Sequence, residues 1–287
     1  MTAGTDPPTS YVLTLRCPDR PGIVNRVTGA LLAVEGNIAE SAQFGDPETM
    51  TFALRTVFDS PSPRADVEAV LGEVATELSA QLTVRPSAER RRALIMVSRY
   101  EHCLLDLLFR QRNGELAIEI PLIVSNHADC GPLAASYGIP YEHIPVTPES
   151  KDEAERLLLR RVSEHAVDFV VLARYMQVLS AEVCAELEGR IINIHHSFLP
   201  GFKGFRPYHQ AHARGVKLIG ATAHYVTTDL DEGPIIEQDV ARVGHSHSAE
   251  DMVSIGRDVE RMVLSRAVRH HAEDRVVLIA SKTVVFS

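Results

Sequence analysis

The sequence predicts two domains of different architecture, an α+β domain followed by an α/β domain. The first 85 residues carry strand and helix patterns in the order βαββαβ. From about residue 93, apolar strands alternate regularly with helices, which is typical of a parallel sheet covered by helices. Residues 86–92 (PSAERRR) between these regions are polar and charged, and we expect a linker there rather than a loop inside one domain. The chain has 287 residues, 45% of them hydrophobic, so each domain can bury a core.

The elements of the first domain follow from side-chain periodicity. Residues 11–16 (YVLTLR) alternate as a strand does, whereas Ile23, Val27 and Leu31 recur at helical spacing. In order, we predict a strand at 11–16, a helix at 22–34, strands at 37–44 and 49–58, a helix at 63–80 and a strand at 81–85. This is the ferredoxin-like, split βαβ order, in which two helices cover one face of a four-stranded antiparallel sheet.

The second domain is expected to be Rossmann-like, with a mostly parallel sheet between helices. Its predicted strands are 92–98, 115–126, 168–173, 190–194 and 220–226, and its helices are 104–112, 129–138, 150–166, 181–189 and 248–275. Ser150 is a candidate helix cap. Residues 275–286 read as a two-stranded ribbon that we assign to this domain, which then spans 93–287. Ligands of such sheets bind beyond the carboxyl ends of the strands.

Composition argues against several classes of protein. The net charge of −9 does not suit a nucleic-acid partner. Four cysteines, with no CxxC pair, predict reduced thiols and neither a disulfide framework nor a metal centre. No apolar run is long enough to span a membrane, and the segment MTAGTDPPTS lacks the pattern of a signal peptide, so we expect a cytoplasmic protein.

Polar side chains gather where the strand at 190–194 ends. Asn193 and His195 lie two residues apart and so face the same way in a strand. Asp231 follows the strand at 220–226 and can reach the same pocket if the two strands are neighbours. An amide and an imidazole can donate hydrogen bonds to a developing oxyanion, and a carboxylate can move a proton. This set suits acyl chemistry without a nucleophilic side chain, since no GxSxG elbow frames Ser197.

Each of these residues also has a structural interpretation. A single histidine near a strand end is often structural, Asn193 fits a turn, and Asp231 fits a loop cap. A metal site is disfavoured because the adjacent His195 and His196 point to opposite faces of a strand.

Residues 192–238, with the pattern NIHxSxLP…H…DxGxI, resemble the formyltransferase family, whose members use 10-formyltetrahydrofolate. The resemblance runs from about residue 93 to the end of the chain. It implies catalytic roles for Asn193, His195 and Asp231, with His224 as a second histidine. It implies further substrate-site residues at Arg174, Tyr175, Met176, Val178 and Leu179, which would receive the pterin, and at His196, Ser197, Leu199 and Pro200. Gln177 stands where many relatives have a basic residue.

Residues 18–38 resemble the ACT regulatory domain, through DRPG, a helix and then GxNI. The resemblance covers residues 1–85 and implies a homo-oligomer and an amino-acid effector near Asp19, Gly22, Asn37 and Ile38. Backbone N–H groups at the start of the helix can hold a small carboxylate. A dimerising domain without a ligand is the alternative.

The acceptor of the formyl group remains to be identified. The stretch 97–108 (VSRYEHCLLDLL) contains no glycine, whereas relatives that formylate glycinamide ribonucleotide carry a glycine-rich phosphate loop after this strand. Because the short ribbon closes the sequence, we also expect no additional domain of the kind that family members acting on tRNA carry. An ACT-like domain ahead of the formyltransferase pattern resembles the hydrolytic, deformylase branch of the family. It implies that water is the acceptor, that the products are formate and tetrahydrofolate, and that no cofactor is needed.

Two alternatives to hydrolysis stay open at this point. One is transfer of the formyl group to a small amine, and the other is a non-catalytic sensor of folate or amino acids. His196 either narrows the acceptor site or packs on the far face of its strand.

Overall fold

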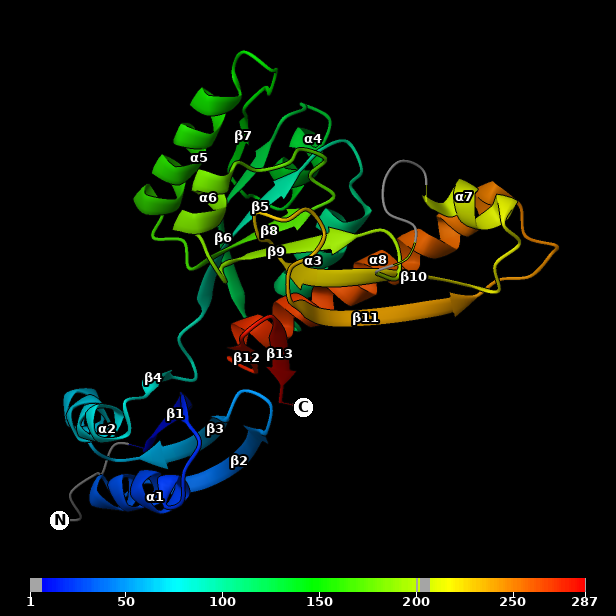
Figure 1. The fold of residues 1–287 in the computed structure, drawn as a ribbon. Helices are drawn as coiled ribbons and strands as arrows, with labels where there is room; N and C mark the ends of the chain where they lie inside the picture. The colour runs from blue at the N-terminus through cyan, green and yellow to red at the C-terminus, as the bar shows by residue number, and fades with distance from the viewer. Residues whose placement is uncertain (1–6, 200, 202–206, 287) are drawn as a thin grey trace. The chain divides into compact units, whose positions relative to one another are not determined.

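The computed structural model describes residues 7–199, 201 and 207–286. These fall into two compact units, one formed by the chain up to Arg90 together with the residues from Glu273 onward, and one formed by Arg91–Ala272 (Figure 1). The division between Arg90 and Arg91 lies inside the expected linker at 86–92.

The first unit contains a four-stranded antiparallel sheet of order β2-β3-β1-β4. Its elements are β1 (Thr9–Pro18), α1 (Ile23–Ala33), β2 (Asn37–Asp46), β3 (Thr51–Ser60), α2 (Arg64–Leu78) and β4 (Gln81–Pro86). The two helices cover one face of the sheet, and Leu13, Leu31, Phe58 and Leu71 are fully buried between them. Helix α1 ends just before Gly36, where a Cβ atom would lie 2.8 Å from the carbonyl oxygen of Leu31.

The C-terminal ribbon belongs to this first unit. It consists of β12 (Val276–Ile279) and β13 (Lys282–Val285). Val277, Ile279 and Phe286 are buried in one apolar cluster with Ala53 of β3. The Arg55 guanidinium also donates to the carbonyl oxygen of Glu273 at 3.1 Å. The expectation that residues 93–287 form one domain therefore holds only as far as Ala272, because the ribbon completes the apolar packing of the other unit.

The second unit is built on a seven-stranded sheet of order β11-β10-β9-β8-β5-β6-β7. Strands β5 to β9 are parallel, and β10 and β11 run antiparallel to their neighbours, which confirms the mostly parallel α/β class. Its elements are β5 (Arg91–Val97), α3 (His102–Arg112), β6 (Ile118–Ser125), α4 (Gly131–Ser136), β7 (Tyr141–His143), α5 (Lys151–Glu164), β8 (Phe169–Ala173), α6 (Ala181–Glu186), β9 (Ile191–His195), α7 (Pro207–Ala213), β10 (Leu218–Tyr225), β11 (Ile235–Arg242) and α8 (Ala249–Ala272).

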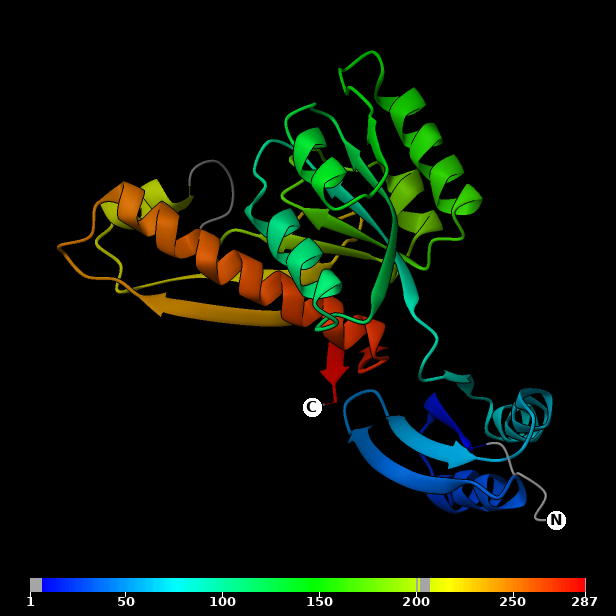
Figure 2. The same ribbon diagram turned by 180° about the vertical axis from the view of Figure 1, so that it is seen from behind.

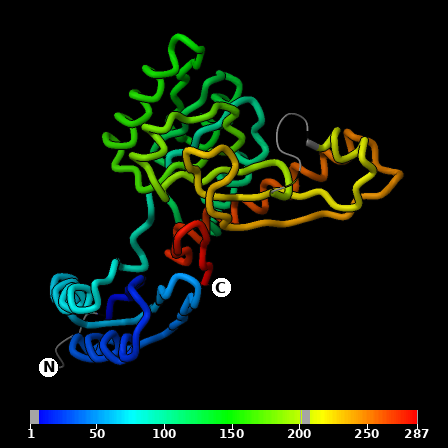
Figure 3. The backbone as a smooth tube through the Cα atoms, in the orientation of Figure 1, coloured from blue at the N-terminus to red at the C-terminus, as the bar shows by residue number. Residues whose placement is uncertain are grey.

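Helices lie on both faces of this sheet. Figures 1 and 2 show α5 and α6 on one face and α3 and α8 on the other. Every residue of β8 is buried, as expected for a central strand covered on both sides. The strand order reverses between β5 and β8, so a crevice is expected at their carboxyl ends. Figure 3 traces the chain through β9, β10 and β11, whose connections carry the predicted site.

Three elements differ from the predictions. Strands β7 and β11 and helix α7 were not predicted from the sequence. Ser150 is the N-cap residue of α5, as predicted, but its hydroxyl accepts a hydrogen bond from the Thr147 backbone instead of from the helix. In α6 the Ser180 hydroxyl does accept from a helix N–H, that of Val183 at 3.3 Å. All four cysteines are free thiols and are buried. Among the described residues, no helix has the length and apolar character needed to cross a membrane.

Candidate active site

The end of β9 and its antiparallel partner β10 position an amide between two imidazoles. Asn193 and His195 share one face of β9, and the strand register places His224 opposite Asn193. The Asn193 amide nitrogen donates to His224 Nε2 at 3.2 Å. His224 Nδ1 lies 2.9 Å from the carbonyl oxygen of Tyr225, which can only accept, so Nδ1 carries the proton. The Asn193 amide therefore retains its second N–H for a ligand.

The loop after β10 turns back toward β9 and presents Asp231. A Cβ atom at Gly233 would lie 1.7 Å from the Tyr225 carbonyl oxygen, so only glycine fits at this close approach. Tyr225 in turn donates its backbone N–H to Pro234 at 2.9 Å. Asp231 itself has φ = +57°, in the left-handed region that costs about 1 kcal/mol for a residue with a side chain. The loop thus holds a strained backbone in order to aim one carboxylate.

The carboxylate of Asp231 contacts both histidines. Its Oδ1 lies 3.2 Å from His195 Nδ1 and 3.7 Å from His224 Nε2. Hydrogen bonding from His195 holds the pKa of Asp231 well below its usual range. The group is therefore an anion at neutral pH and a weak base.

His195 is 5% exposed and presents an unused nitrogen. Because Nδ1 faces the carboxylate, Nδ1 carries the proton and Nε2 is the acceptor of the neutral ring. Nε2 is buried and makes no hydrogen bond within the part of the chain that the structure describes. Buried polar atoms are nearly always paired, so this atom points to a missing ligand or water.

A cavity opens over these groups and contains most of the predicted substrate residues. It is lined by Leu172, residues 174–179, residues 193–196, His224 and residues 226–231. Met176 and Val178 are more than half exposed, at 53% and 56%, and form an apolar rim. Burial raises the pKa of the Tyr175 hydroxyl to about 12, so it stays protonated. Gln177 also lines the cavity.

His196 faces the cavity, whereas Ser197 does not line it. Burial, and then the charge of Arg174, lower the pKa of His196 to about 4, so this ring is neutral at physiological pH. The hydroxyl of Ser197 donates to the carbonyl oxygen of Gly201 at 2.7 Å and braces the turn after β9. Leu199 is buried in that turn, and Pro200 lies outside the described residues.

Residues 91–268 match the formyl transferase family. A formyltetrahydrofolate deformylase of Corynebacterium sp. (strain P-1) is 48% identical over 278 residues, which cover 96% of this chain and 97% of that protein. The chain belongs to the formyltetrahydrofolate deformylase family. The deformylase of Bacillus subtilis (strain 168) is 44% identical over 96% of this chain and 93% of its own length.

Solved structures agree with membership of the deformylase family. The crystal structure of a formyltetrahydrofolate deformylase from Burkholderia mallei matches with a TM-score of 0.94 and 50% identity, covering 98% of this chain and 100% of that chain. A glycinamide ribonucleotide transformylase from Symbiobacterium toebii matches with a TM-score of 0.65 and 28% identity, covering 69% of this chain and 95% of that chain. The match to deformylases therefore covers 96–98% of the chain, and the match to this transformylase covers 69%.

The residues expected to bind a regulatory ligand lie apart within one chain. Asp19 and Gly22 follow the end of β1, and Gly22 begins helix α1 with φ = +93°. Asn37 and Ile38 start β2 and pair with the far end of β3. Because the end of β1 pairs with the start of β3 and the start of β2 pairs with its end, the two pairs of residues do not form one site in a single copy.

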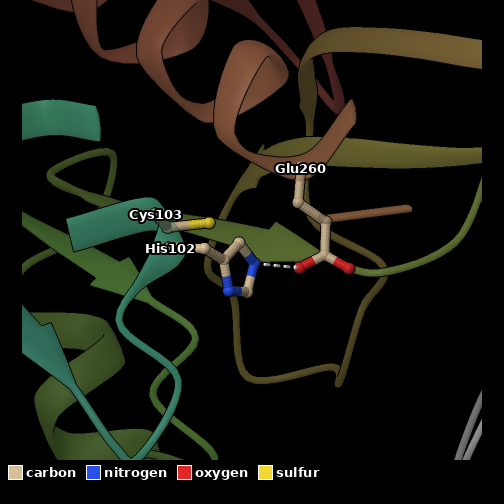
Figure 4. A group of neighbouring side chains, drawn as sticks. All are labelled: His102, Cys103 and Glu260. Atoms are coloured by element: carbon tan, nitrogen blue, oxygen red, sulfur yellow. Dashed lines mark hydrogen bonds and ion pairs between the residues drawn. The ribbon is translucent and has the colours of Figure 1, made fainter. Parts of the chain in front are cut away.

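A second buried cluster, which the sequence analysis missed, lies beside the cavity. Glu260 of α8 is 1% exposed and receives hydrogen bonds from His102 Nε2 and from the Tyr208 hydroxyl, each at 2.8 Å. Figure 4 shows His102 and Cys103 at the start of α3 facing Glu260. The signal in the sequence was a glutamate on the apolar face of α8, next to the buried Val259, Val263 and Leu264.

This cluster has the composition of a metal site but not the charge balance of one. One ligand atom from each of His102, Cys103 and Glu260 lies within 4.8 Å of the others. However, Arg174 Nε lies 3.5 Å from Glu260 Oε2, and burial raises the pKa of the Cys103 thiol well above its ordinary value. Burial alone would raise the pKa of Glu260, but the hydrogen bond from His102 and the charge of Arg174 outweigh it and lower that pKa. A metal ion here would be repelled by the guanidinium that already neutralises the carboxylate.

Proposed function

We propose that this chain hydrolyses 10-formyltetrahydrofolate to formate and tetrahydrofolate. The observation that carries the proposal is that Asn193, His195 and Asp231 meet at one cavity within hydrogen-bonding distance of one another or of His224. These groups supply a donor, a base and a fixed anion, so the reaction needs no cofactor. The identity with named deformylases over 96% of the chain supports the same reaction.

The folate would lie along the segment from Arg174 to Leu179. Met176 and Val178 offer apolar surface to the pterin ring. This pose brings the formyl carbon over the end of β9, beside Asn193 and His195.

Water would attack the formyl carbon with His195 as the base. The sequence led us to expect Asp231 as the proton acceptor. Its lowered pKa makes this carboxylate a weak base, so it suits that role poorly. His195 Nε2 is the better acceptor, because it is buried and unpaired and its Nδ1–H is held by the Asp231 carboxylate. That carboxylate stabilises the imidazolium once it forms.

The oxyanion and the leaving amine complete the reaction. The free N–H of the Asn193 amide would donate to the oxyanion, with His224 fixing the orientation of the amide. Collapse of the tetrahedral intermediate breaks the bond between carbon and N10, and the imidazolium of His195 returns its proton to that nitrogen. Formate and tetrahydrofolate then leave.

For the first unit we propose an ACT-like regulatory role in a homo-oligomer. The βαββαβ order and the Gly22 turn at the start of α1 support it. Strand β2 is an edge strand, and most of its residues are exposed, which leaves it open to pair with another copy. An effector site shared between copies would also explain why Asp19 and Asn37 lie at opposite ends of the sheet. Light scattering and calorimetric titration with amino acids test this role, and a monomer that binds no amino acid would contradict it.

One incubation tests the proposed reaction. The purified chain is mixed with 10-formyltetrahydrofolate and no amine, and formate and tetrahydrofolate are followed together. Equal release of both products supports hydrolysis. Release only after adding an amine would make the chain a transferase, and binding without turnover would make it a sensor. Asn193→Ala should retain folate binding and lose about 100- to 1000-fold in rate.

A further inference from the structure

Arg174 closes the side of the cavity next to the Glu260 cluster. It stands directly after β8, with φ = +62° in the left-handed region. The side chain is 11% exposed and its guanidinium lies 5.4 Å from the centre of the Tyr100 ring. Within the described residues, Nε and Nη1 are buried and have no hydrogen-bond partner. Arg174 thus lines the cavity that contains His195 with a guanidinium whose Nη1 is unpaired, whereas its Nε faces the Glu260 carboxylate.

The Glu260 cluster holds this guanidinium in place. Glu260 Oε2 lies 3.5 Å from Arg174 Nε, and His102 and Tyr208 fix the carboxylate. Tyr208 packs so closely on α8 that a Cβ atom at Gly256 would lie 2.1 Å from its ring. A buried ion pair that is fixed by further hydrogen bonds is rigid, so moving Arg174 out of the side of the cavity costs free energy.

The guanidinium can only donate hydrogen bonds, and this distinguishes between nucleophiles. A water molecule can give one proton to His195 Nε2, accept from Arg174 with one lone pair and attack carbon with the other. A primary amine has a single lone pair. If that pair attacks carbon, the buried N–H of Arg174 stays unpaired, and leaving a buried charged donor unpaired costs about tenfold or more in rate. A protonated amine is repelled by the guanidinium.

Building on the proposed hydrolysis, we propose that Arg174 is the residue that selects water over amines as the formyl acceptor. Glu260, His102 and Tyr208 are positioning residues that act through Arg174. Proteins named as transferases share the fold of the second unit, so the fold alone does not choose the acceptor.

The test measures how the formyl group partitions between water and an added amine. The full chain is incubated with 10-formyltetrahydrofolate and glycinamide at alkaline pH, where part of the amine is unprotonated, and N-formylglycinamide and formate are quantified by mass spectrometry. Wild type should yield formate almost exclusively. Arg174→Gln leaves Glu260 its bonds from His102 and Tyr208 and offers a carbonyl oxygen that accepts from an amine N–H. It should raise the ratio of formylglycinamide to formate about tenfold or more.

A matched control and a second variant complete the design. Arg161→Gln removes an arginine that is paired with Glu142 and does not line the cavity, and its ratio should equal that of wild type. If Arg174→Gln does not fold, the double variant Arg174→Met with Glu260→Gln removes both charges of the pair and should show the same rise.

Each outcome either supports or overturns the selection role. An unchanged ratio in a folded variant that binds folate contradicts it, and so does loss of both reactions, which would make Arg174 necessary for the chemistry itself. Wild type that transfers readily to glycinamide also overturns it. Failure of the proposed function is distinct, because wild type would then release no formate in the absence of amine.

Discussion

Asp231→Asn removes a negative charge while keeping the shape of the loop. In the proposed reaction, His195 becomes an imidazolium whose Nδ1 lies 3.2 Å from Asp231 Oδ1. At an effective dielectric constant of about 20, such a pair is worth about 5 kcal/mol. The amide dipole of asparagine recovers part of this, so we expect a net loss of about 3 to 4 kcal/mol, or about 100- to 1000-fold in kcat. An asparagine N–H that donates to Nδ1 would also place the ring proton on Nε2 and remove the base.

The assay for Asp231→Asn is single-turnover release of formate from 10-formyltetrahydrofolate, with folate affinity measured separately by titration. Affinity should change little, because the loss falls on the transition state. Glu232→Gln is the matched control, since this exposed neighbour in the same loop does not line the cavity, and it should stay within about twofold of wild type. If Asp231→Asn kept kcat within tenfold of wild type, the carboxylate would not be stabilising an imidazolium and the reasoning would be wrong.

Three further predictions follow from the same geometry. Gly233→Ala must displace the loop, because its Cβ atom would lie 1.7 Å from the Tyr225 carbonyl oxygen, and kcat should fall about 100-fold; activity above half of wild type would contradict this. The folded pKa of His196 is about 4, below the unfolded value of about 6.5, so the unfolded chain binds more protons between these pH values and stability falls as pH drops through that window. Between pH 7 and pH 4, the free energy of unfolding measured with urea should therefore fall by about 3 kcal/mol less in His196→Asn than in wild type. Equal falls in the two proteins would refute the lowered pKa of His196. A variant that ends at Ala272 lacks the ribbon, whose Val277, Ile279 and Phe286 are buried in the first unit. The truncation should lower the free energy of unfolding of that unit by about 5 kcal/mol and therefore its melting temperature. An unaltered melting profile would show that the ribbon is dispensable.

The core of the site was predictable because it depends on local periodicity. Asn193 and His195 alternate in a strand, so they share a face wherever that strand lies in the sheet. Asp231 required one further assumption, that the strand before it neighbours β9, and the antiparallel pairing of β10 with β9 meets it. The apolar strands of the second unit likewise predicted the class of its sheet, since burial on both faces removes polar alternation.

Features that depend on long-range packing were not predictable from the sequence. Glu260 and His102 are 158 residues apart and meet only because α3 and α8 pack on the same face of the sheet. The C-terminal ribbon has the pattern of any hairpin, and nothing local indicates that it joins the first unit. Ser197 lies within the motif, but its hydroxyl is used by the turn, which the spacing of residues cannot show.

Isotope incorporation tests the central claim most directly. A single turnover of 10-formyltetrahydrofolate in water enriched in oxygen-18, with no amine present, is quenched and the formate is analysed by mass spectrometry. Attack by water activated at His195 predicts one solvent-derived oxygen in each formate molecule, formed together with an equal amount of tetrahydrofolate. Unlabelled formate, or no formate until an amine is supplied, would contradict hydrolysis at this site.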